Sequence, residues 1–314
     1  MKLQTQIPLR EEDSKFVYES KLLLLGSCFV ENIGQKLDYY KFQQVQNPFG
    51  ILFHPLAIEN LVKRALHDEM YEENEVFEHQ EIWNCFDAHS DCSATSKPEL
   101  LQNLNDGLRQ TKKQLTEASH IIITLGTAWV YRNTENGKIV ANCHKVPQQQ
   151  FSKELLSVDS IRGCLERLVD LIQSVNEKAT LIFTISPVRH LKDGFVENQR
   201  SKAHLINALH EVRKGRNISY FPSYELMMDE LRDYRFYEKD MVHPNQLAIA
   251  YIWEKFKSVW IAEEVYSSME EVETVQKGLL HRPFNPSSHA HQKFTTSLQA
   301  KIAYLQKKYP FIQF

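Results

Sequence analysis

The sequence predicts an α/β protein with a parallel sheet, and three observations point to that class. Apolar runs of strand length alternate with segments whose apolar residues recur at helical spacing. The runs at 21–26, 120–131 and 179–186 are apolar almost throughout, as expected of strands buried on both faces. No internal repeat and no low-complexity linker interrupts the alternation. Strand followed by helix, repeated along one chain, is typical of a parallel sheet with helical crossovers.

The predicted elements follow one another from the first strand onward. The predicted strands are 21–26, 41–50, 120–131, 179–186 and 218–227. The predicted helices are 31–37, 55–69, 98–118, 159–175, 199–213 and a segment that starts at Pro244. The run at 120–131 is rich in β-branched residues and is expected to be a central strand, and Pro187 ends the next one. Asp159 is the expected cap of its helix, and Pro244 is expected in a first helical turn.

After about residue 262 the pattern contains helices alone. Two helical stripes are expected there: Val265, Met269, Val272, Val275 and Leu279, then Phe294, Leu298, Ile302 and Leu305. We therefore expect one domain over 1–261 and a C-terminal helical extension over 262–314. The extension is expected to pack on the domain, and a homo-oligomer formed through these helices is the alternative.

Composition and charge argue against several classes of protein. Of 314 residues, 42% are hydrophobic and 25% are charged, which is enough apolar material for a core. The formal net charge of -3, with no basic run among aromatic residues, argues against nucleic acid as a partner. The N-terminal segment lacks the apolar stretch of a signal peptide, and no apolar run is long enough to span a bilayer. We expect a cytoplasmic, reducing location.

The cysteines do not predict disulfides or a metal site. There are five, an odd number scattered along the chain, which argues against a disulfide framework. Cys85, His89 and Cys92 lie close together, but their spacing matches no common zinc pattern. No metal and no organic cofactor are expected.

Two residues that can act as nucleophiles follow the first predicted strand. Ser27 and Cys28 come directly after Gly26, where parallel sheets usually carry their chemistry. The N-terminus of the helix that follows stabilises negative charge. A base is also needed, and His243 stands in a D-x-x-H loop with Asp240. In this spacing the carboxylate can accept the second N–H of the imidazole and orient the ring.

Several stretches of the chain resemble the GSCFA-domain family, which is related to the SGNH (GDSL-like) hydrolases. The matching stretches are "LGSCFVENIG", "NPFGILFHP", "TLGTAWVY", "NCHKVP", "SPVRHLKDGFVENQRSKAHL" and "YFPSYELMMDELRDYRFYEKDMVHP". They cover most of residues 20–260. The resemblance implies a flavodoxin-like three-layer α/β/α sandwich, with a nucleophile after the first strand and a triad completed by Asp240 and His243.

The register of the resemblance favours the thiol as nucleophile. GDSL-like enzymes carry Gly-Asp-Ser after their first strand, so aligning that glycine with Gly26 places Cys28 in the nucleophile position. A cysteine beside a histidine and at a helix N-terminus is strongly nucleophilic. Ser27 takes this role if the turn shifts by one residue. In a third interpretation both are small residues that a tight turn requires.

The oxyanion-binding groups depart from the hydrolase pattern. The block that usually supplies Gly-x-Asn-Asp reads "GTAW" here, so Ala128 replaces the expected asparagine. Thr127 or a neighbouring N–H is one substitute, and Asn142 and Asn47 are others. Gly50 is the expected second donor, through its backbone N–H, or else a plain turn residue.

A basic segment follows the strand at 179–186. Arg189 and His190, with Arg200 and Lys202 further on, form a possible cationic cluster for a carboxylate or phosphate of the substrate. The alternative is pairing with the local acids Asp193 and Glu197.

The leading hypothesis for function is an acyl-ester hydrolase. Its triad is Cys28 or Ser27 with His243 and Asp240, and its substrate is a small-molecule or carbohydrate acyl ester. The alternatives are an acyltransferase with the same triad and a catalytically inactive binding relative.

Overall fold

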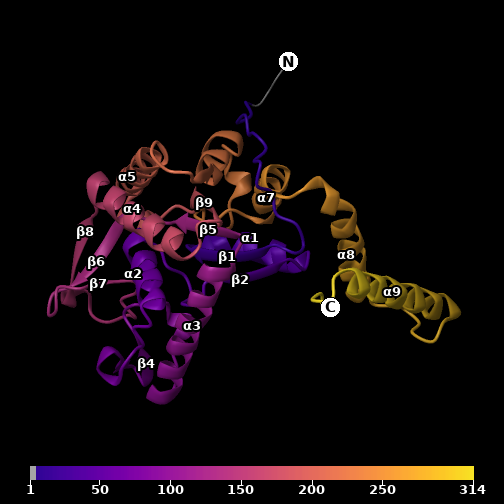
Figure 1. Cartoon of the computed structure of the whole chain (residues 1–314), viewed down its shortest axis with the longest axis horizontal. Helices are drawn as coiled ribbons and strands as arrows, with labels where there is room; N and C mark the ends of the chain where they lie inside the picture. The colour runs from indigo at the N-terminus through magenta and orange to yellow at the C-terminus, as the bar shows by residue number, and fades with distance from the viewer. Residues whose placement is uncertain (1–4) are drawn as a thin grey trace.

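A five-stranded parallel sheet forms the centre of the computed structural model, which describes residues 5–314 (Figure 1). The strands are β1 (Lys21–Gly26), β2 (Gln43–Gln46), β5 (His120–Leu125), β9 (Thr180–Ile185) and β10 (Ser219–Phe221). Their order across the sheet is β10-β9-β5-β1-β2. In chain order this is the 2-1-3-4-5 arrangement of flavodoxin-like folds, whose switch point lies between β1 and β5.

Helices cover both faces of the sheet because successive strand residues point to opposite sides. One face packs on α2 (Pro55–Leu66), α3 (Lys97–Glu117), α4 (Val158–Val175) and α5 (Phe195–Arg213). The other face packs on α1 (Cys28–Tyr39) and α7 (Gln246–Trp260). In β1, Leu23 and Leu25 join the first core, whereas Leu22 and Leu24 join the second. The predicted three-layer α/β/α sandwich is confirmed.

The predicted strand at 120–131 is wrong in its second half. β5 ends at Leu125, and the chain then enters a separate antiparallel sheet made of β6 (Trp129–Asn133), β7 (Ile139–Val140) and β8 (Phe151–Leu155). The break occurs because the N–H groups of Gly126 and Thr127 both donate to the Phe53 carbonyl, at 2.8 and 2.9 Å, instead of extending the ladder. Between α2 and α3, the strands β3 (Phe77–His79) and β4 (Ile82–Asn84) form a small antiparallel hairpin.

Three predicted boundaries also differ from the structure. Ser157 caps α4 by accepting from the Ser160 N–H at 3.1 Å, so the expected cap Asp159 lies inside the helix. Asn245 caps α7, which places Pro244 before the cap. The segment at 218–227 is a strand only over β10, because Pro222 ends it.

Short helical turns fill many of the connections. Those after β10 are α6 (Ser223–Glu225) and a π-helix (Leu226–Glu230). The 3₁₀ helices are Glu73–Glu75, Ser90–Cys92, Gln148–Gln150, Leu191–Asp193, Tyr234–Phe236 and Glu263–Val265. Among residues 5–314, no helix combines the length and apolar character needed to cross a membrane.

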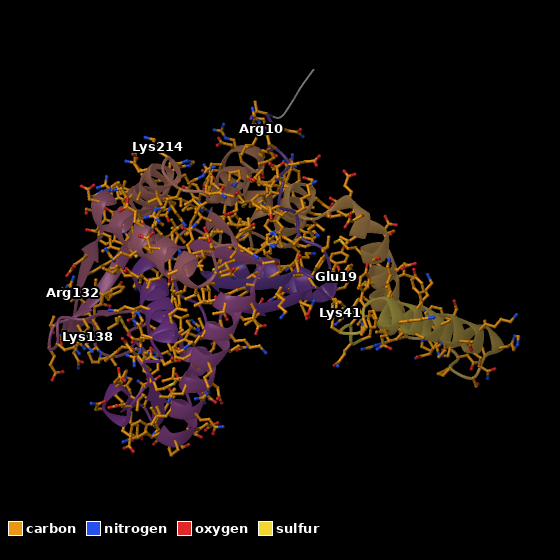
Figure 2. All side chains as sticks on the ribbon, in the orientation of Figure 1. Arg10, Glu19, Lys41, Arg132, Lys138 and Lys214 are labelled. Carbon is orange, nitrogen blue, oxygen red and sulfur yellow. The ribbon has the colours of Figure 1, made fainter. Side chains whose placement is uncertain are left out.

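The C-terminal helices are α8 (Tyr266–Leu279) and α9 (His289–Lys308), and Figure 1 shows α9 extending away from the sheet. They pack on the rest of the chain because residues such as Met269, Val272 and Leu305 join the core that α1 and α7 share. The rings of Tyr18 and Tyr309 stack 4.4 Å apart, and the ammonium of Lys41, which is labelled in Figure 2, lies 5.9 Å from the centre of the Phe314 ring. Of the two stripes, Leu279 is exposed and so, in part, is Phe294. The division at residue 261 and the homo-oligomer stay predictions.

Candidate active site

A tight turn carries the chain from β1 into α1 at the switch point of the sheet. Gly26 has a φ of +128°, and a Cβ there would lie 2.1 Å from the Thr124 carbonyl oxygen of the neighbouring strand. Its N–H donates to Asn47 Oδ1 at 2.9 Å. Only glycine fits this close approach, and it delivers Ser27 and Cys28 to the carboxyl end of the sheet.

Ser27 and Cys28 occupy different environments. Ser27 is the N-cap of α1 and is fully buried, and its Oγ has no hydrogen-bond partner among the described residues. Cys28 is the first residue of α1 and is a half-buried free thiol. The first N–H groups of a helix have no partner inside it, and within residues 5–314 the Cys28 N–H has no backbone acceptor outside it. Of the two side chains, the thiol is therefore the more accessible.

Asp240 and His243 form a hydrogen-bonded pair in the loop before α7. Asp240 Oδ2 accepts from His243 Nδ1 at 2.6 Å, and its Oδ1 accepts the backbone N–H groups of Val242 and His243 at 2.8 and 3.0 Å. These bonds, with the backbone N–H of His243 foremost, lower the pKa of the Asp240 carboxyl to about 2. The carboxylate can only accept, so the proton lies on Nδ1.

The His243 ring also forms a hydrogen bond with Cys28, more than two hundred residues away in sequence. Because Nδ1 is bonded to Asp240, Nε2 is the nitrogen left for the sulfur. The hydrogen bond with Cys28, and then that with Asp240, raises the pKa of His243 to about 9, although partial burial opposes the change. The structure thus brings together Cys28, His243 and Asp240 in one chain of hydrogen bonds.

Arg189 holds the loop that carries this pair. Its backbone N–H donates to the Val242 carbonyl at 3.3 Å, and its Nη2 donates to the Met241 carbonyl. Its guanidinium lies 4.3 Å from the centre of the Tyr237 ring. Through these contacts Arg189 supports the loop of Asp240 and His243. Anion binding by its side chain stays a prediction.

His190 and Lys202 differ from the expected cationic cluster. His190 is largely buried, and this burial, followed by the charges of Lys202 and His243, lowers its pKa to about 3, so its ring is neutral. Lys202 is fully buried and donates from Nζ to the carbonyls of Gly126 and Ser186 at 2.7 and 2.8 Å. The alternative of pairing with Asp193 is wrong, since Asp193 binds Lys153.

Lys202 therefore joins the carboxyl ends of β5 and β9 beneath the thiol. Burial lowers its pKa to about 7, whereas the nearby Cys28 acts in the opposite direction. The sequence shows a lysine on a helix, and nothing in its local pattern reveals that the side chain points inward.

Two expected oxyanion donors are already engaged elsewhere. The Gly50 N–H donates to the Asn47 carbonyl at 2.7 Å, which makes Gly50 a turn residue. The Thr127 N–H donates to the Phe53 carbonyl, and its hydroxyl bonds Ser201 Oγ at 3.0 Å. Neither group is free to bind an oxyanion. Ser201, which sequence analysis missed, also accepts the Ala128 N–H at 2.7 Å.

The two expected asparagines have structural partners. Asn47 holds the Gly26 turn through its Oδ1, whereas its Nδ2 is buried and has no hydrogen-bond partner in the described part of the chain. Asn142 accepts the His144 N–H at 2.9 Å and donates to Ser90 Oγ at 3.3 Å. No bond links Asn142 to the Cys28 site in the described chain.

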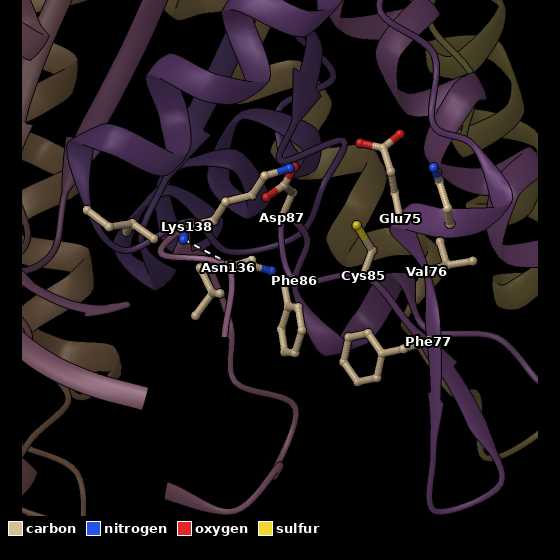
Figure 3. A pocket seen from close by; sticks show the side chains of 11 residues that line it. Glu75, Val76, Phe77, Cys85, Phe86, Asp87, Asn136 and Lys138 are labelled. Carbon is tan, nitrogen blue, oxygen red and sulfur yellow. Dashed lines mark hydrogen bonds between the residues drawn. The ribbon is translucent and has the colours of Figure 1, made fainter. Parts of the chain in front are cut away.

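A separate pocket is formed beside the small antiparallel sheets (Figure 3). Its lining comes from 74–77, 85–87, Asn136 and 138–140, and includes none of the predicted site residues. The rings of Phe77 and Phe86, which are among the lining residues, stack 4.2 Å apart. Its carboxylates already have partners within the protein. Over residues 5–314 no cluster of three or more His, Cys, Asp or Glu side chains is arranged to hold a metal ion.

Comparisons with known proteins give a family and one distant structural likeness. No curated protein matches the chain. Among solved structures it is similar to an acetyl xylan esterase (Est2A) from the rumen bacterium Butyrivibrio proteoclasticus, with 11% sequence identity and a TM-score of 0.38. That match covers 76% of this chain and 63% of the esterase, less than two thirds of its length. The model of the GSCFA family matches residues 21–256, and that of the GSCFA domain protein C-terminal domain matches 272–314. The chain belongs to the GSCFA family.

Proposed function

We propose that the protein is an acyl-ester hydrolase in which Cys28 is the nucleophile, His243 the general base and acid, and Asp240 the residue that orients His243. The observation that carries this proposal is the hydrogen-bonded chain from Cys28 through His243 to Asp240 at the carboxyl end of the sheet. Nucleophile, base and orienting carboxylate in this arrangement are the parts that acyl transfer needs. The buried hydroxyl of Ser27 supports Cys28 over Ser27.

The reaction proceeds in two steps. The single proton that Cys28 and His243 share lies on Nε2 at the start of the reaction. The sulfur adds to the acyl carbon, so that a C–S bond forms and the carbonyl electron pair moves to the oxygen. When the oxyanion collapses, the C–O bond breaks and the leaving alcohol takes the proton from His243. A water molecule then gives a proton to the neutral His243, and the resulting hydroxide attacks the thioester. Collapse of this second intermediate breaks the C–S bond and releases the acid, while the proton stays on His243 Nε2 for the next cycle.

The setting of the thiol supports this chemistry. The first N–H groups of α1 point toward the region where negative charge develops during the reaction, and a helix N-terminus stabilises such charge. All five cysteines are free, which fits a proposal that the enzyme works in a reducing compartment such as the cytoplasm. We propose a small-molecule or carbohydrate acyl ester as substrate, and no step needs a cofactor.

Labelling and turnover of three variants test the nucleophile. Wild type, Cys28→Ala, Cys28→Ser and Ser27→Ala are each treated with iodoacetamide and assayed with p-nitrophenyl acetate. We expect Cys28→Ala to lose both site-specific labelling and acyl-enzyme formation, and Ser27→Ala to keep both. Turnover that persists in Cys28→Ala but disappears in Ser27→Ala would contradict the assignment. Product analysis with and without an added alcohol distinguishes a hydrolase from an acyltransferase.

A further inference from the structure

The asparagine that GDSL-like enzymes use to stabilise an oxyanion is missing after β5. Ala128 stands where a GDSL-like enzyme has asparagine, and its N–H is bonded to Ser201 Oγ. The backbone N–H groups of Gly50 and Thr127 already donate to the carbonyls of Asn47 and Phe53. The proposed reaction nevertheless develops a full negative charge on the carbonyl oxygen, and one donor at that oxygen is typically worth about a hundredfold or more in rate.

His190 places a ring nitrogen beside the backbone at this point. A Cβ built on Gly126 would lie 3.4 Å from His190 Nε2 and 3.0 Å from the Cβ of Ser27, the residue before the nucleophile. His190 Nε2 is buried and has no hydrogen-bond partner in the described part of the chain. The histidine ring thus lies next to Gly126, the glycine of the "GTAW" stretch in which GDSL-like enzymes carry the asparagine.

The surrounding structure fixes the His190 ring in this position. The ring packs edge-on against Phe53, with centroids 5.6 Å apart and planes at 86°. Its backbone N–H donates to the buried side chain of Asn198 at 2.9 Å. Through Arg189 the same segment is bonded to the loop of Asp240 and His243. A donor held this way needs no rearrangement when charge develops.

Charge and burial keep the ring neutral. Burial is the main cause that lowers the pKa of His190, and the charges of Lys202 from α5 and His243 from the loop before α7 lower it further. A neutral imidazole carries one N–H, and it can donate that N–H without competing with His243 for the proton of Cys28.

We propose that His190, with its proton on Nε2, is a catalytic residue that donates a hydrogen bond to the oxyanion formed when Cys28 adds to the acyl carbon. The backbone N–H of Cys28 is the second donor. The His190 proton stays on Nε2 throughout, because the oxyanion returns its electron pair to the carbon when the leaving group departs. This inference rests on the proposed function and adds the group that replaces the missing asparagine.

The test compares acylation with alkylation of the same thiol. Alkylation by iodoacetamide forms no oxyanion, whereas acylation by p-nitrophenyl acetate does. Both rates are measured for wild type, His190→Phe, His190→Gln and the control His210→Phe, whose ring lies on α5 beside Tyr220. We expect His190→Phe to acylate about 10²–10³-fold more slowly, with KM within about threefold and alkylation within about twofold of wild type. His190→Gln keeps a side-chain N–H and should recover part of the loss.

The outcomes separate this inference from the proposed function. If His190→Phe acylates Cys28 as fast as wild type, or if acylation and alkylation fall together, His190 is not an oxyanion donor. If wild type and Cys28→Ala do not differ in acylation, the proposed function itself fails. If His190→Phe loses acylation but keeps alkylation, and His210→Phe keeps both rates, the result supports His190 as the oxyanion donor and Cys28 as the nucleophile.

Discussion

At the scale of single residues, His243 sets the pH range in which the proposed enzyme works. Hydrogen bonds with Cys28 and with Asp240 raise its pKa to about 9. Above that pH the imidazolium loses its proton, and the leaving alcohol can no longer receive one. We expect kcat/KM for an alkyl acetate, whose alcohol needs a proton in order to leave, to fall on the alkaline side with an apparent pKa of about 9 when it is measured from about pH 6 to 10.5.

Asp240→Asn should move that alkaline limb. Without the carboxylate at 2.6 Å, the imidazolium loses one of the bonds that stabilise it, so its pKa falls and the limb shifts to lower pH. The kcat should fall by about 10²–10⁴-fold, because an amide no longer fixes the tautomer. Asp233→Asn is the matched control, since Asp233 is an exposed partner of Arg235 outside the triad. An unchanged pH profile in Asp240→Asn would show that the pair does not control catalysis.

The sequence predicted some of these residues and not others, for a physical reason. The D-x-x-H spacing is local, so the bond between Asp240 and His243 could be inferred without knowing the fold. The meeting of His243 with Cys28 required the order of strands, which the alternating pattern and the family resemblance supply. The roles of His190 and Lys202 depend on which way each side chain points and on burial among distant elements. No local spacing encodes these.

At the scale of elements, the turn between β1 and α1 is the part that places the nucleophile. Gly26→Ala should lower the free energy of unfolding by about 3 kcal/mol or more, because an unfavourable φ adds to an overlap with the Thr124 carbonyl. Gly137→Ala is the matched control: its φ is +70°, but nothing lies within 4 Å of the added Cβ. It should cost about 1 kcal/mol. Equal effects in urea unfolding would contradict the close approach.

The elements also show where apolar patterns predict structure well. The strands next to β5, β1 and β9, are buried on both faces, and the helices that cover the sheet bury one stripe each. The type of each was predicted correctly. The prediction of one strand over 120–131 was wrong after Leu125. The residues stay apolar there, but the backbone N–H groups of Gly126 and Thr127 donate to the Phe53 carbonyl instead of to a neighbouring strand. Predicted helix starts were wrong by one or two residues. In α4 the N-cap is Ser157 and not the predicted Asp159, because several neighbouring polar side chains can serve as caps.

At the scale of the whole molecule, the buried Lys202 links stability to pH. Its pKa is lowered from the usual 10.5 to about 7, so between these values the unfolded chain binds more protons than the folded one. Stability therefore gains from this lysine as pH rises through that window. The difference in unfolding free energy between wild type and Lys202→Met should shift in favour of wild type by up to about 1.4 kcal/mol from pH 8 to 9.

An exposed lysine gives the comparison for that measurement. Lys214 lies at the surface (Figure 2) with most of its side chain in solvent, so Lys214→Met should show no such trend. Urea unfolding of the three proteins at pH 7, 8, 9 and 10 checks this. A constant difference between wild type and Lys202→Met would mean that the lysine keeps its charge in the folded protein.

The C-terminal helices should contribute to the stability of the whole chain because their buried residues belong to the same core as β1 and α7, and Tyr309 is one of these residues. Tyr309 stacks on Tyr18, which precedes β1, and its hydroxyl bonds Ser268 at 3.1 Å. Tyr309→Ala should lower the free energy of unfolding by about 3–5 kcal/mol, as for other large buried rings. Tyr304→Ala, on α9 and 52% exposed, should change it by less than about 0.5 kcal/mol. If both variants unfold like wild type in a single transition, α8 and α9 pack too weakly on the sheet domain to stabilise it. If only Tyr309→Ala unfolds earlier, with one transition, the extension and the domain that carries Cys28 fold as one cooperative unit.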